Sequence, residues 1–74
     1  MDKFELAKTI GNRIKSIRIS KGISQQQLAA DCNFEKSNMS RIEAGRTNIT
    51  VYTLFVISKA LNVSIQELLN QLDY

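Results

Sequence analysis

Four polar side chains near the middle of the chain have the types and spacing to form hydrogen bonds on one surface. They are Lys36, Ser37, Ser40 and Arg41, at positions i, i+1, i+4 and i+5, which a helix places on a single arc. Met39 and Ile42 mark the opposite, apolar side of the same stretch. Lysine and arginine can donate to O6 and N7 of guanine, and serine can contact several bases. The pattern is typical either of a solvated helix surface or of a surface that reads base edges.

The residues just before this stretch favour base reading. Ser24 and Gln27 have the spacing of a capping box, which predicts that a helix begins there and runs to about Cys32. Asn33 suits a left-handed turn position, because asparagine tolerates a positive φ better than most residues. Two short helices joined by so tight a turn are the arrangement that inserts its second helix into a DNA groove.

The composition excludes several other functions. The chain has no histidine and a single cysteine, Cys32, so it lacks the usual metal ligands, an intrachain disulfide and a nucleophile–base pair. We therefore expect no enzyme activity, no cofactor, no metal and no small-molecule ligand. The net charge of +3 and the pI of about 9.3 mildly favour a polyanionic partner. No signal peptide is visible and the longest apolar run, 54–57, is far below the ~20 residues that span a bilayer. We expect no membrane partner and a cytoplasmic protein, nucleoid-associated when bound to DNA.

Apolar residues recur at helical spacing almost throughout, and proline is absent. The sequence predicts an all-α fold and a single domain over 1–74, with helices at about 3–21, 24–32, 35–44, 51–61 and 64–72. In the first helix Leu6 shares one face with Ile10 and its successors, and Gly11 weakens the helix by about 1 kcal/mol, which allows a break or bend. Thr50 is a candidate N-cap for the fourth helix, and Ser64 with Glu67 forms a second capping box.

At these positions the chain resembles the Cro/CI-type helix-turn-helix domain (the XRE family), which includes phage repressors and restriction–modification controller proteins. The resemblance runs from about Ile10 to Leu69. It is carried by Ile14, Ile17 and Arg18, by Lys21 to Gln25, Leu28 and Ala29, by Met39 to Arg46, by Thr53 and Leu54, by Ile57, Ala60 and Leu61, and by Val63 and Ser64. It implies a five-helix, lambda-repressor-like fold whose third helix lies in the major groove of double-stranded DNA.

The resemblance also implies roles for individual residues. The base-reading positions correspond to Lys36, Ser37 and Arg41, with Ser40 nearby. Contacts to the phosphate backbone, which set register and affinity but carry no sequence preference, fall on Gln25, Asn38, Arg46 and Asn48. Arg18 and Glu43 match positions that form a partly buried ion pair between the first and third helices.

Two positions need separate interpretation. Glu35 stands where the family often has a serine or threonine N-cap. It either caps the third helix, which we favour, or accepts a hydrogen bond from N4 of cytosine. Cys32 falls on the apolar side of the second helix, so we expect it to pack in the core, without a redox or catalytic role.

The fourth helix carries more apolar surface than one small core can use. We expect Val51, Leu54, Ile57 and Leu61 to face inward together. The remaining apolar residues predict a dimer interface that comprises Tyr52, Phe55, Val56, Leu72 and Tyr74. A two-fold homodimer would place two third helices one DNA turn apart, about 34 Å, on a palindromic operator.

The sequence thus predicts a dimeric, sequence-specific DNA-binding transcriptional regulator, either a repressor or a restriction–modification controller. An alternative is an antitoxin or protein-interaction module whose main partner is another protein. That alternative would use the same apolar surface of the last two helices to bind a different chain.

Overall fold

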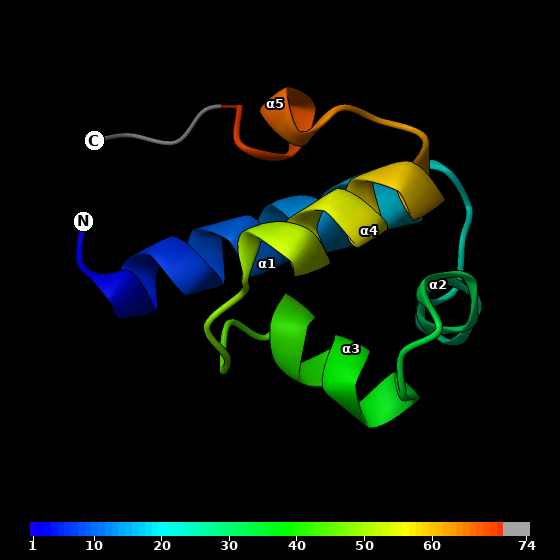
Figure 1. Cartoon of the computed structure of the whole chain (residues 1–74), viewed down its shortest axis with the longest axis horizontal. Coiled ribbons are helices and arrows are strands. Elements are labelled where there is room, and N and C mark those ends of the chain that lie inside the picture. The colour runs from blue at the N-terminus through cyan, green and yellow to red at the C-terminus, as the bar shows by residue number, and fades with distance from the viewer. Residues whose placement is uncertain (71–74) are drawn as a thin grey trace.

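The computed structural model describes residues 1–70 and is helical throughout that range (Figure 1). Five helices follow one another: α1 Lys3–Ser20, α2 Gln25–Cys32, α3 Lys36–Glu43, α4 Val51–Leu61 and α5 Ile65–Leu68. These residues contain no strand, which confirms the expected all-α class. The observed helix ends agree with the predicted ones to within one residue everywhere except at the end of α5.

The last helix is shorter than the sequence predicted. Instead of running to residue 72, α5 ends at Leu68. The amide of Asn70 then donates to the carbonyl of Glu67, an i to i+3 bond that tightens the last turn. The expected interface residues Leu72 and Tyr74 lie outside the described residues.

Short polar side chains begin most of the helices. Thr50 and Ser64 cap α4 and α5 as predicted, and Ser64 with Glu67 forms the complete capping box. Ser24 caps α2, but the reciprocal half of its expected box is absent because the Gln27 amide donates to Asp31 instead. The expected cap by Glu35 is wrong: this residue occupies the N-cap position of α3, but its side chain makes no capping hydrogen bond.

One apolar core joins all five helices. Its fully buried side chains come from every element: Ile14, Leu28, Met39, Ile57, Leu61 and Leu68. α1 packs against α3, α4 and α5, and α2 packs against α3 and α4. Figure 1 shows the consequence, with α5 on one side of the α1–α4 pair and α3 on the other. None of the helices described here is both long and apolar enough to cross a membrane.

Helix α1 passes Gly11 without a break, contrary to the bend that the sequence allowed. Gly11 is buried against the end of α3, and a Cβ atom there would lie 2.7 Å from the carbonyl oxygen of Glu43 and closer still to that of Ile42. The glycine is therefore used for close approach of two backbones.

Two residues expected in the core are exposed. Val51 is 76 % exposed. It is the first residue of α4, and its side chain points toward the amino-terminal end of the helix, beyond the part that packs in the core. Ser58 takes the fourth place on the inward face of α4, and its hydroxyl donates to the carbonyl of Phe55. Leu6 is likewise more exposed than its partners Ile10 and Ile14, since it lies near the free end of α1.

Candidate nucleic-acid interface

Helix α3 divides cleanly into a buried and an exposed side. Met39, Ile42 and Glu43 are buried, whereas the four expected base-reading residues are all exposed: Lys36, Ser37, Ser40 and Arg41. In Figure 1 α3 lies at one edge of the molecule, with α2 beside its amino-terminal end. No described element covers this arc, so a flat or convex partner can reach it.

The turn between α2 and α3 is fixed by backbone geometry. Asn33 has φ 60° and ψ 39°, the left-handed conformation that its residue type predicted. The amide of Phe34 donates to the carbonyl of Ala29 at 2.8 Å, and the amide of Asn33 to that of Ala30 at 3.0 Å. These bonds pair carbonyl groups in the last turn of α2 and set the direction in which α3 begins.

A buried ion pair connects α1 to α3, as the resemblance implied. Arg18 Nε donates to Glu43 Oε2 at 2.7 Å and its Nη2 to Oε1 at 3.0 Å, so the contact is bidentate. The residues are only 9 % and 4 % exposed. Nη1 of Arg18 also donates to the carbonyl of Ile23. Because both partners are held on several sides, the pair fixes the carboxyl-terminal end of α3 against α1.

Gln25 joins this network from the first turn of α2. Its Nε2 donates to Glu43 Oε1 at 3.0 Å, so one carboxylate links α1, α2 and α3. No pattern in the sequence indicates this contact, because the two residues are polar and lie far apart in the chain. The side chain is only half-buried, and its role as a phosphate contact stays a prediction.

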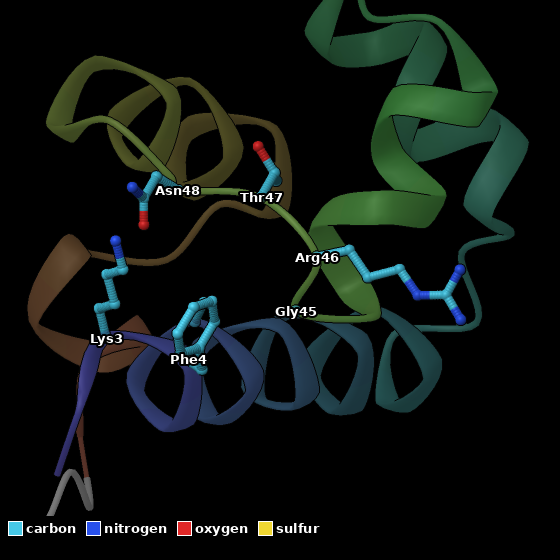
Figure 2. A pocket seen from close by; sticks show the side chains of 7 residues that line it. Lys3, Phe4, Gly45, Arg46, Thr47 and Asn48 are labelled. Carbon is cyan, nitrogen blue, oxygen red and sulfur yellow. The ribbon is translucent and has the colours of Figure 1, made fainter.

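The other expected phosphate contacts lie on α3 and in the loop that follows it. Asn38 is half-buried, whereas Arg46 and Asn48 are exposed. Gly45 has φ 74°, and the amide of Arg46 donates to the carbonyl of Arg41, which turns the chain sharply away from α3. Figure 2 shows that the side chains of Arg46 and Asn48 point in different directions from the loop. They are therefore placed to meet different groups on a partner.

A cavity of about 470 Å³ lies between this loop and the first turn of α1. Lys3, Phe4 and Ala7 form its α1 side, and Gly45 to Asn48 form the loop side. In Figure 2 the ammonium of Lys3 points toward the side-chain oxygen of Asn48. No motif in the sequence marks Lys3 and Phe4, because the family resemblance begins only near Ile10.

Cys32 is buried in the core, as predicted. Burial, with a smaller effect from neighbouring Asp31, raises the pKa of its thiol from 9.0 to about 11. A thiol with so high a pKa is a poor nucleophile at neutral pH. Within residues 1–70 no group of three His, Cys, Asp or Glu side chains is placed to hold a metal ion.

Two curated proteins illustrate what the chain is similar to. The HTH-type transcriptional regulator y4dJ of Sinorhizobium fredii is 35 % identical over 69 residues, which are 93 % of this chain and 90 % of that protein. The control protein C.BamHI of Bacillus amyloliquefaciens is 38 % identical over 61 residues, 81 % of this chain and 75 % of that protein.

A solved structure agrees with these relatives. The restriction–modification controller protein C.Esp1396I, described as a tetramer in complex with its natural 35 base-pair operator, superposes with a TM-score of 0.75 at 34 % identity. The match covers 88 % of this chain and 96 % of that one. The sequence model of the family described as Helix-turn-helix (HTH_3) matches residues 14–68. With the α2–turn–α3 geometry, these matches show that the chain belongs to the helix-turn-helix family of transcriptional regulators.

Proposed function

We propose that this helix-turn-helix protein regulates transcription as a two-fold dimer that reads a palindromic operator with α3, as a repressor or a restriction–modification controller. The observation that carries the proposal is the exposed arc of α3, with Lys36, Ser37 and Arg41 at its centre. Their ammonium, hydroxyl and guanidinium groups can donate to base edges in the major groove. The buried side of the same helix holds this arc rigidly, through Met39 and Ile42.

Backbone contacts would set the register of α3 on the duplex. Gln25 begins α2, Asn38 lies on α3, and Arg46 and Asn48 follow α3, so the four residues flank the proposed reading arc. Such contacts supply affinity that falls steeply with salt and is independent of sequence. The operator complex of C.Esp1396I supports the choice of double-stranded DNA as partner.

The dimer would form through what we term the α4 aromatic face, which comprises Tyr52 and Phe55 with Val51 beside them. These residues are 73 %, 45 % and 76 % exposed. Val56, which the sequence also placed in the interface, is only partly exposed and packs against the core, so it contributes less. Large exposed apolar side chains that adjoin one another are typical of an interface.

The experiment that tests this function is selection of duplexes from a random DNA library by the full chain. We expect a palindromic consensus whose half-sites are separated by about one helical turn. A variant with Lys36→Ala and Arg41→Ala should select no consensus while keeping its helical circular dichroism. Recovery of no enriched sequence by the wild-type chain would contradict the proposal.

The exposed α4 aromatic face also fits the alternative of a module that binds a different protein. Sedimentation of the purified chain separates the two. A homodimer supports the regulator, whereas a monomer that co-purifies with one partner and shows no sequence preference on DNA favours the alternative.

A further inference from the structure

The cavity between α1 and the α3–α4 loop lies beside the proposed DNA-reading surface but is formed partly by residues outside it. Its loop side begins at Gly45, which directly follows Ala44, the C-cap residue of α3. Its α1 side consists of Lys3, Phe4 and Ala7, from the first two turns of that helix. A backbone group of DNA flanking the groove that α3 enters would therefore pass close to the cavity.

The lining of the cavity has a polar and an apolar part. Figure 2 shows the Lys3 ammonium pointing toward the side-chain oxygen of Asn48 across the opening, with the ring of Phe4 beside Lys3. The Lys3 ammonium lies 5.4 Å from the centre of that ring, so the aromatic face holds the charge near the opening. Asp2, the nearest carboxylate in the chain, accepts from the amide of Glu5 to cap α1. No ion pair to any carboxylate of residues 1–70 engages Lys3.

This combination fits one chemical class well, a sugar–phosphate group. The phosphate oxygens would accept from the Lys3 ammonium and from the Asn48 Nδ2, which faces the opening when the amide turns half a rotation about its terminal bond, while the deoxyribose would lie against Phe4 and Ala7. An ammonium is a strong phosphate partner as a point charge, and an amide adds a directed hydrogen bond.

We propose that this cavity receives one sugar–phosphate group of the DNA backbone, with Lys3 as a phosphate contact shared with Asn48. The inference rests on the proposed function, because it needs α3 to lie in the groove. It extends the DNA-binding surface from the helix-turn-helix to the first turn of α1. Arg46, which points away from the cavity in Figure 2, would contact a different phosphate.

The test compares Lys3→Gln with Lys15→Gln on a fluorescent random-sequence duplex, with affinity measured by anisotropy across a KCl series. Lys15 is also exposed and on α1, but 12 residues further on, about 18 Å along the helix. Both variants lose one positive charge. We expect the slope of log affinity against log salt to become shallower by about 0.9 for Lys3→Gln only. Equal slopes in the two variants would overturn the proposal.

A double-mutant cycle tests whether Lys3 and Asn48 share the phosphate. If they do, Lys3→Gln should weaken binding less in an Asn48→Ala background than in the wild type. The same cycle with Arg46→Ala should be additive, because the contacts are separate. Additivity for Lys3 and Asn48 would contradict a shared phosphate. Thermal melts should be the same for all of these variants, since each residue is exposed.

The outcomes of these titrations, together with a competition experiment, distinguish failure of this inference from failure of the proposed function. If the wild-type chain binds no duplex, the proposed function itself fails. If it binds and Lys3→Gln behaves as Lys15→Gln, only the cavity inference fails. Inorganic phosphate at constant ionic strength should not compete with the duplex, because the site needs the sugar as well. Competition that Lys3→Gln abolishes would identify a free-anion site instead.

Discussion

Arg41 and Arg46 lie five residues apart, yet their positions predict different roles. Arg41 projects from the exposed arc of α3, whereas Arg46 projects from the loop that follows this helix. We expect Arg41→Ala to cost about 1–3 kcal/mol on the selected operator and to relax the preference at one base position. Competition against operators mutated one base at a time measures this. An unchanged preference would show that Arg41 is not a reader.

Arg46→Ala should instead weaken all duplexes alike and make the salt dependence shallower by about 0.9, because a phosphate contact carries no sequence information. Affinities for the operator and for a scrambled duplex across a salt series provide the measurement. A selective loss on the operator alone would contradict the assignment to the backbone.

Glu43 is the residue whose removal should affect folding most. Glu43→Ala leaves the Arg18 guanidinium buried with only the Ile23 carbonyl as partner. We expect a loss of about 3–5 kcal/mol in the free energy of unfolding, measured by urea denaturation. Replacing both charges, with Arg18→Met and Glu43→Leu, should recover much of it. Unchanged stability of Glu43→Ala would show that the pair contributes nothing.

The Cys32 thiol makes stability depend on alkaline pH. Its pKa is 9.0 ordinarily and about 11 in the fold, so between these values the unfolded chain loses a proton that the folded chain keeps. The free energy of unfolding should therefore fall as pH rises above about 9. In Cys32→Ala this decline should be smaller, since only the other groups titrate. Parallel pH profiles of the two proteins would contradict the burial of the thiol.

For single residues, the sequence predicted exposure and burial better than it predicted which side chains contact one another. The exposed arc of α3 and the burial of Cys32 follow from helical periodicity, which can be recognised within a single short segment of the sequence. The contact of Gln25 with Glu43, and the failure of Glu35 to cap, depend on which side chains the fold brings together. No local spacing encodes that choice.

At the scale of helices, the sequence likewise did not predict how α1 and α3 pack against each other. Periodicity located both helices, but it treated Gly11 only as a weak point, although the glycine lets the carboxyl-terminal end of α3 reach the α1 backbone. Val51 was misplaced because periodicity assigns a face and takes no account of where a helix ends. The order and extent of elements were thus predictable, and their crossing was not.

Gly11→Ala tests the role of this crossing. In a solvated helix the change should stabilise by about 1 kcal/mol, but here the added Cβ would meet the carbonyl oxygens of Ile42 and Glu43. We expect a net loss of stability and weaker operator binding, because α3 must move away from α1. Ser16→Ala, at an exposed position of the same helix, should be neutral or slightly stabilising. Urea denaturation compares them, and a more stable Gly11→Ala would contradict the close approach.

A single subunit is small for a protein that is proposed to read a palindromic operator. Its 74 residues support one compact core, and one α3 reads only half of a palindrome. A two-fold dimer would address both limits, because binding between subunits adds stability and doubles the number of reading helices.

The last prediction concerns this assembly. Tyr52→Lys places a charge at the centre of the α4 aromatic face and should convert the dimer to a monomer in sedimentation equilibrium. Ile19→Lys is the matched control, because Ile19 is another exposed apolar residue, 58 % exposed, but it lies on α1. It should remain dimeric. Tyr52→Lys should also bind the full palindrome no better than a single half-site, whereas Ile19→Lys should keep the wild-type preference for the palindrome. A dimer that survives Tyr52→Lys would place the interface elsewhere on the molecule.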